Sequence, residues 1–191
     1  LLVGANNTSK STIFIFDISN VDDLKLEDRI VLNLPDADIS FDVKYENDND
    51  IANKIFRSLT LSPDETKLAF TFYNFNTAYI YDLSAKTRER DISYNHSGFS
   101  FEIEIIYWHL EDNNILYYTT YAENINPNAN NNFHHLIRYD ISTNTDIHLF
   151  SGFVNYISDL EMSPDYSKLA VVGYDNQIND KLNNFFILDP R

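Results

Sequence analysis

The sequence predicts an all-β protein built from about four copies of one strand–turn–strand unit. A nine-residue stretch at 62–70 returns in closely similar form at 163–171. Each copy follows residues whose apolar side chains alternate, as they do along a half-buried strand. No window shows a long amphipathic pattern with the 3.6-residue period of a helix. Self-similarity at a spacing of tens of residues indicates a propeller or a solenoid.

The repeated stretch predicts a tight turn between two strands. Both copies begin Ser-Pro-Asp, at 62–64 and at 163–165. Proline presets φ at the second turn position, and aspartate can hydrogen-bond the local backbone. The β-branched and aromatic run that follows favours a second strand. After a variable gap, a third apolar run ends in aspartate, at Asp82 and at Asp189.

Two weaker copies complete the pattern. One spans 105–118 and has its turn rewritten as Glu-Asp-Asn-Asn at 111–114, and the other lies at 1–19 without a first strand. We therefore predict one domain over 1–191, a partial β-propeller whose blades have up to four antiparallel strands and which is truncated mid-blade at both ends. The predicted blades are approximately 1–34 (partial), 54–94, 101–150 and 153–191 (partial). In the most regular blade we predict strands at 56–61, 67–73, 78–83 and 87–93.

Composition excludes several classes of site. The chain has no cysteine, which excludes a disulfide or a thiolate metal site. Its net charge of −15 argues against binding nucleic acid or an anionic membrane surface. No run approaches the roughly 20 apolar residues of a membrane span. His134 and His135 are adjacent on a predicted strand and should face opposite ways, so we predict no metal site there and no cofactor.

Long polar connections give the only candidate binding residues. In a four-stranded up-and-down blade, the connections at 35–55, 122–133 and 174–184 open on one face, opposite the Ser-Pro-Asp turns. Loops held by a rigid scaffold often carry function, so we hypothesise that this long-loop face binds a partner. The alternative is that these connections are simply solvated polar loops. The acidic residues of the predicted face are Asp36, Asp38, Asp42, Asp48, Asp50, Glu123, Asp175 and Asp180.

The repeat resembles the TolB-like, or WD-like (PD-type), β-propeller repeat. The resemblance rests on Leu-Ser-Pro-Asp at 61–64 with Leu-Ala-Phe at 68–70, and on Met-Ser-Pro-Asp at 162–165 with Leu-Ala-Val at 169–171. It spans the whole chain, strongly in two copies and weakly in two. The sequence departs from it at Glu65 and Tyr166, where the family usually has glycine. The resemblance favours a periplasmic or other extracytoplasmic location.

The resemblance implies three functional alternatives, because one fold serves many functions. The first is a non-catalytic binding or scaffold propeller, favoured because the sequence shows no nucleophile–base pair, metal-ligand spacing or phosphate-binding glycine loop. The second is the gating propeller of a larger prolyl-oligopeptidase-like hydrolase, whose G-x-S-x-G motif does not occur here. The third is a propeller-type lyase. The expected partner is another protein or the remaining blades of a larger chain, and open blade edges favour self-association.

Overall fold

The computed structural model describes most of the chain in nine ranges: 2–7, 10–17, 25–32, 56–73, 75–94, 99–124, 133–151, 156–174 and 183–189. These ranges contain fourteen β-strands and no helix. The chain divides into two compact units, Leu1–Phe56 and Arg57–Arg191. The predicted all-β class is confirmed.

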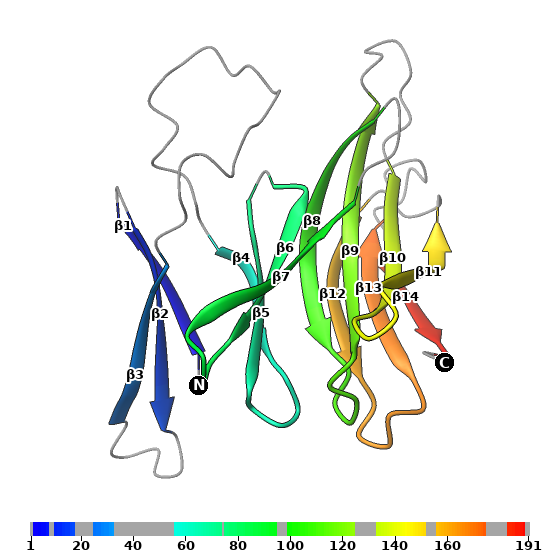
Figure 1. The fold of residues 1–191 in the computed structure, drawn as a ribbon. Helices are drawn as coiled ribbons and strands as arrows, with labels where there is room; N and C mark the ends of the chain where they lie inside the picture. Colours follow the sequence, from blue (N-terminus) through cyan, green and yellow to red (C-terminus); the bar gives the residue numbers. More distant parts are fainter. Residues whose placement is uncertain are drawn as a thin grey trace. The chain divides into compact units, whose positions relative to one another are not determined.

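The first unit contains a three-stranded antiparallel sheet in the order β1-β2-β3 (Figure 1). Its strands are β1 (Leu2–Asn7), β2 (Lys10–Asp17) and β3 (Lys25–Leu32). The run Ile-Phe-Ile-Phe at 13–16 has the β-branched and aromatic composition that suits a central strand. In agreement, β2 pairs with both neighbours, and Ile13 is fully buried.

The second unit contains three antiparallel sheets, two of four strands and one of three. The first has β4 (Phe56–Leu61), β5 (Lys67–Phe72), β6 (Thr77–Asp82) and β7 (Thr87–Ser93). The second has β8 (Phe99–Trp108), β9 (Ile115–Asn124), β10 (Phe133–Asp140) and β11 (Thr145–Ser151). The third has β12 (Tyr156–Met162), β13 (Leu169–Tyr174) and β14 (Asn183–Leu188). In each sheet the strands follow chain order, as the repeat predicts.

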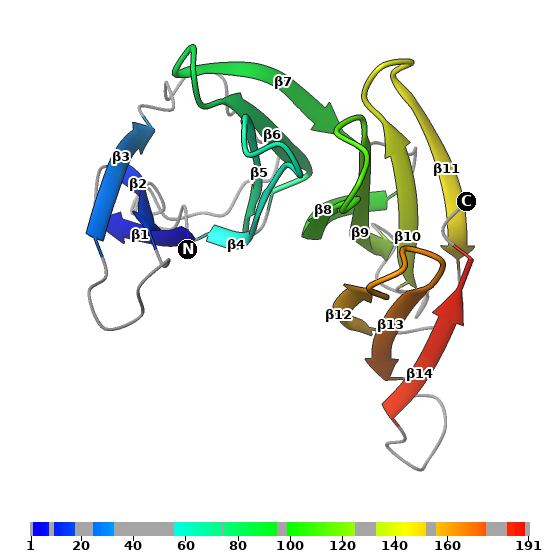
Figure 2. The same cartoon turned by 90° about the horizontal axis from the view of Figure 1, so that it is seen from below.

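The three sheets pack in sequence with their first strands, β4, β8 and β12, along one side (Figure 2). Two cores fill the spaces between them. The core between the first and second sheets includes Ala69, Ile80, Ile103 and the only tryptophan of the chain, Trp108. The core between the second and third sheets includes Tyr117, Leu136, Ile157 and Leu160. These residues supply the apolar burial that holds the unit together.

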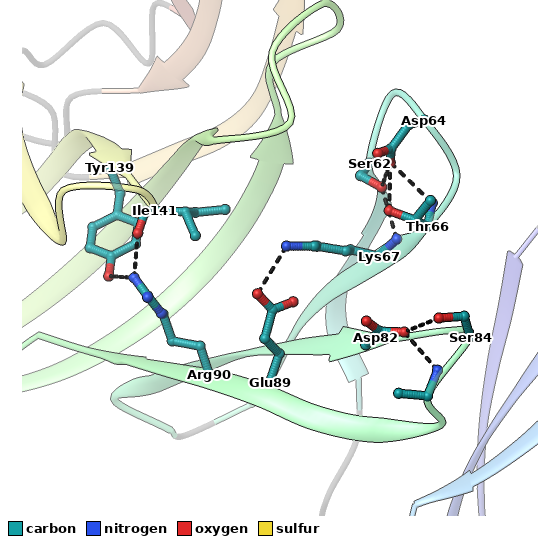
Figure 3. Close-up of polar contacts among 11 residues, drawn as sticks. Ser62, Asp64, Thr66, Lys67, Asp82, Ser84, Glu89, Arg90, Tyr139 and Ile141 are labelled. Atoms are coloured by element: carbon teal, nitrogen blue, oxygen red, sulfur yellow. Dashed lines mark hydrogen bonds and ion pairs between the residues drawn. The ribbon is translucent and has the colours of Figure 1, made fainter.

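The Ser-Pro-Asp turns form as predicted, at what we call the turn end of the second unit, where β4, β8 and β12 finish. The Ser62 hydroxyl donates to Asp64 Oδ1 (2.7 Å) and accepts from the Lys67 backbone N–H (2.9 Å). Thr66 donates to the same carboxylate oxygen through its N–H and its hydroxyl (Figure 3). The turn is therefore closed mainly by the side chains of Ser62 and Asp64.

Two non-glycine residues in these turns adopt a conformation that glycine favours. Glu65 has φ 59° and Tyr166 has φ 58°, both in the left-handed region that normally favours glycine. Both residues make the same backbone hydrogen bond. The Glu65 N–H donates to the Ser62 carbonyl oxygen at 2.9 Å, and the Tyr166 N–H donates to the Ser163 carbonyl oxygen at 2.8 Å. Turn geometry is thus preserved without glycine, at a conformational cost.

A second kind of turn joins the third and fourth strands of each complete sheet. Asp82 Oδ1 accepts from the Ala85 N–H (2.7 Å) and the Ser84 hydroxyl (2.8 Å). Asp140 accepts in the same way from residues 142 and 143. Each turn ends on a residue with positive φ, Lys86 at 55° and Asn144 at 56°. The aspartate that ends each third strand is therefore a turn-forming residue.

Two predicted loop boundaries were wrong. Residues 122–124 belong to β9, where they pair with Phe101, Ser100 and Phe99, so the connection after β9 begins at 125. Similarly, β13 continues to Tyr174 and β14 begins at Asn183. Polar composition misled the prediction, because backbone pairing with a neighbouring strand is indifferent to side-chain polarity at a strand end.

Within the nine described ranges, nothing helical is long and apolar enough to cross a membrane.

Candidate functional site

We call the opposite end of the second unit the loop end, where β4, β8, β10 and β12 begin and β5, β9, β11 and β13 finish. It lies opposite the Ser-Pro-Asp turns, as the predicted long-loop face should, and the sequence analysis assigned eight acidic binding residues to that face. Of the eight, Glu123 lies in β9, paired with Ser100. The other seven, Asp36, Asp38, Asp42, Asp48, Asp50, Asp175 and Asp180, lie outside the described residues.

The described part of the loop end contains a buried charged group that sequence reasoning missed. We call Arg57, Glu104 and His134 the Glu104 cluster; they come from β4, β8 and β10. Arg57 Nη2 donates to Glu104 Oε1 at 2.8 Å. His134 Nδ1 lies 3.2 Å from Glu104 Oε2, within ion-pair distance for a protonated imidazole. One carboxylate thus lies between two basic side chains from two different sheets.

A β-bulge in β8 positions Glu104. Ile103 pairs with Thr120 and Ile106 pairs with Tyr118, so Glu104 and Ile105 together oppose Thr119. The Thr119 hydroxyl accepts from the Ile105 N–H at 3.1 Å, which satisfies a backbone group that the bulge removes from the ladder. A bulge changes the direction of a side chain and is common next to functional sites.

The bulge is also secured from the neighbouring sheet. The Thr71 hydroxyl on β5 donates to the Glu104 backbone carbonyl at 2.8 Å, in a fully buried position. On β4, the Ser58 hydroxyl lies 3.1 Å from both the N–H and the carbonyl oxygen of Ile106. Buried backbone groups that leave a strand ladder need such partners. The position of Glu104 is therefore fixed by contacts from two sheets.

Exposure divides the cluster into an inner and an outer part. The side chain of His134 is 1% exposed and that of Glu104 is 8% exposed, whereas that of Arg57 is 18% exposed. The Arg57 guanidinium lies 4.5 Å from the ring centre of Tyr73, a cation–π distance, and Tyr73 is itself 41% exposed. On the inner side, the His134 ring lies 5.0 Å from that of Tyr121. The buried carboxylate thus holds the half-buried Arg57 beside a tyrosine that is exposed to solvent.

The outermost charged group of this arrangement is the Arg57 guanidinium, which engages Glu104 through Nη2. Planar guanidinium groups commonly recognise carboxylates and phosphates. A buried ion pair contributes little to stability once desolvation is counted. Across the described ranges, no three His, Asp or Glu side chains are grouped so that they could hold a metal ion.

His134 and His135 do face opposite sides of β10. His134 lies beside Glu104 and Tyr121, while the His135 ring lies 6.1 Å from that of Tyr94. No sequence pattern joins Arg57, Glu104 and His134, which are separated by 47 and 30 residues. The only sequence signal was an acidic residue inside the apolar run of β8, where alternation fails.

Comparison with known proteins supports the fold and leaves the function open. No protein-family model and no curated protein matches the sequence. Among solved structures, a Bacteroides uniformis protein provisionally described as a 6-phosphogluconolactonase is similar, with 11% identity and a TM-score of 0.51 over 98% of this chain and 52% of its own. A Lactobacillus plantarum protein has 11% identity and a TM-score of 0.49 over 96% of this chain and 53% of its own.

The chain spans about half the length of both solved structures. At this identity the first similarity shows the fold alone. Together with the four antiparallel sheets of three or four strands, it confirms the predicted class: an all-β protein with the sheets of a partial β-propeller.

Proposed function

We propose that this chain is a non-catalytic binding or scaffold segment of a β-propeller, which engages a protein partner or ligand through its loop end. The observation that carries the proposal is the Arg57–Tyr73 pair. The Arg57 guanidinium lies 4.5 Å from the centre of the Tyr73 ring, and Arg57 Nη2 donates a hydrogen bond to the buried Glu104 carboxylate. Tyrosine and arginine are the residue types that contribute most to binding energy at interfaces, particularly when they are held rigidly.

The acidic character of the chain extends this proposal. A net charge of −15 gives the molecule a negative field. Such a field would speed the approach of a basic partner and give specificity more than affinity. The proposed partner is accordingly a protein with a basic surface, or the remaining blades of a larger chain. The TolB-like character of the repeat, which also favours an extracytoplasmic location, agrees with a binding role.

Two alternatives remain in the proposal. A gating propeller of a prolyl-oligopeptidase-like hydrolase requires a G-x-S-x-G motif elsewhere in the same polypeptide, and sequencing the full reading frame tests it. A propeller-type lyase requires acid–base groups that substrate can reach. Glu104 and His134 are an acid and a base within 3.2 Å of each other, but their side chains are 8% and 1% exposed. This burial favours a positioning role over a catalytic one.

The binding role is tested with two equally exposed residues at opposite ends of the second unit. Tyr73 is 41% exposed at the loop end, and Leu110 is 42% exposed at the turn end. We expect Tyr73→Ala to reduce recovery of a specific partner from extracts of the source organism, quantified by mass spectrometry, while Leu110→Ala leaves recovery unchanged. Deleting residues 126–131, which spares β9 and β10, should also reduce it. Equal recovery with all three variants would refute the proposal.

A further inference from the structure

A second group of polar side chains lies at the loop end on the other face of β10. His135 on β10 and His148 on β11 have ring centres 5.5 Å apart, with planes inclined by 76°. Tyr94, just after β7, lies against both, and its hydroxyl is 3.2 Å from His148 Nε2. We refer to His135 and His148 as the histidine pair.

The strand register explains why these two rings meet. Ile137 pairs with His148, and His135 lies two residues before Ile137, so all three side chains share one face. A register shift between Leu136 and Ile137 places Leu149 as the extra residue of β11. Diagonal cross-strand neighbours of this kind are close enough for rings to interact. The pair is therefore set by backbone pairing between β10 and β11.

We propose that the histidine pair binds a divalent transition-metal ion of the class that prefers imidazole ligands, such as Zn²⁺ or Cu²⁺. Two imidazoles on a tetrahedral Zn²⁺, with Zn–N distances of about 2.0–2.1 Å, bring their ring centres about 5 Å apart. The 5.5 Å separation of the His135 and His148 ring centres is close to that value. Water completes the coordination, because His148 is exposed to solvent.

Tyr94 has a separate role in the proposed site. A histidine that binds a metal through one ring nitrogen usually donates a hydrogen bond from the other, which fixes the ring and its tautomer. The Tyr94 oxygen lies at hydrogen-bond distance from His148 Nε2, which assigns Nδ1 to the metal. The Tyr94 hydroxyl thus serves in the proposed site as a partner of the imidazole rather than as a metal ligand.

The charge of the chain favours entry of a cation. The net charge of −15 raises the local concentration of divalent ions around the molecule. Carboxylates prefer Mg²⁺ and Ca²⁺, whereas imidazole selects Zn²⁺, Cu²⁺ and Ni²⁺. Excess Mg²⁺ therefore occupies nonspecific carboxylate sites without competing for the histidine pair. The proposal is independent of partner binding at the Glu104 cluster.

The test is a calorimetric titration of the full chain with Zn²⁺ in excess Mg²⁺, together with NMR of the five histidine rings. We expect one bound Zn²⁺ per chain and shifts confined to two rings. His148→Gln and His135→Gln should each weaken binding by at least about tenfold, and Tyr94→Phe by about tenfold. His109→Gln, which changes a histidine at the turn end, should leave binding unchanged.

The outcomes separate a metal site from aromatic packing. His148 is exposed, so His148→Gln should fold normally, and its circular dichroism spectrum checks this. Absence of Zn²⁺ binding to the unmodified chain would overturn the proposal. Binding that survives both His148→Gln and His135→Gln would also overturn it, because the ion would then lie elsewhere.

Discussion

The turn end and the loop end of the second unit are built in different ways. At the turn end, the same residue types make the same contacts in different sheets. Ser62 and Ser163 each donate to an aspartate at 2.7 Å, and each accepts from a lysine N–H at 2.9 Å. At the loop end, Arg57, Glu104 and His134 make contacts that the repeat does not specify. The contacts of the turn end thus recur from sheet to sheet, whereas the contacts of the loop end belong to one place in the unit.

The largest effect is expected from breaking the Glu104 cluster. Glu104→Leu removes the partner of Arg57 and leaves a mostly buried cation, which should lower the free energy of unfolding by about 2–4 kcal/mol. The matched control at the turn end is Glu89→Leu, since Glu89 pairs with Lys67 at 2.9 Å in a more exposed position (Figure 3). That change should cost less than about 1 kcal/mol. Urea denaturation measures both, and equal losses would contradict the comparison.

A smaller loss is expected at the repeated turn. Asp64→Ala removes the acceptor of three hydrogen bonds, from the Ser62 hydroxyl and from the N–H and hydroxyl of Thr66. It should lower the free energy of unfolding by about 1 kcal/mol, because the site is exposed and water replaces part of the loss. Asp165→Ala should act in the same direction, since its contacts are the same. Opposite effects of the two substitutions in thermal denaturation would refute the equivalence of the turns.

A gain in stability is expected where the turn lacks glycine. Glu65→Gly relieves a left-handed backbone and should raise the free energy of unfolding by about 0.5–1 kcal/mol, after the entropic cost of glycine. Thr66→Gly, one residue further on, has no such strain to relieve and should lower stability. Tyr166→Gly should not raise the free energy of unfolding, because Tyr166 also packs against the core between the second and third sheets. A lower free energy of unfolding for Glu65→Gly would contradict this and would show that the left-handed conformation of Glu65 has no cost.

The smallest expected effect is a loss of stability in acid, centred on the turn end. The Ser62 hydroxyl lowers the pKa of Asp64, the Ala85 N–H lowers that of Asp82, and burial lowers that of His109. Each group then binds protons more weakly in the folded state than in the unfolded one, so stability falls as pH falls.

The loss should occur in two steps. The His109 contribution is complete above pH 6.5 and declines below it, and the aspartate contributions decline below pH 3.8. His109→Gln should remove the first step and leave the second. Denaturation midpoints measured from pH 7 to pH 3 check this, and an unchanged first step in that variant would contradict it.

The strands and turns could be predicted because local sequence determines them. Ser-Pro-Asp and the alternating runs around it identify β4, β5 and β6 within one or two residues. The bulge at Glu104 could not be predicted, because it shifts the alternation so that Ile103 and Ile106 both enter the core. The Glu104 cluster and the histidine pair depend on register and packing between distant strands, which one sequence does not show.

The burial of Trp108 has a practical consequence for measuring all of these effects. It is the only tryptophan in the chain, and it lies in the core between the first two sheets of the second unit. Its backbone N–H also lies 3.5 Å from the Thr60 hydroxyl, so its surroundings depend on how β4 meets β8. Intrinsic tryptophan emission therefore reports the opening of that contact. An emission change that precedes the loss of far-ultraviolet dichroism would show that the contact between β4 and β8 opens before the strands themselves are lost.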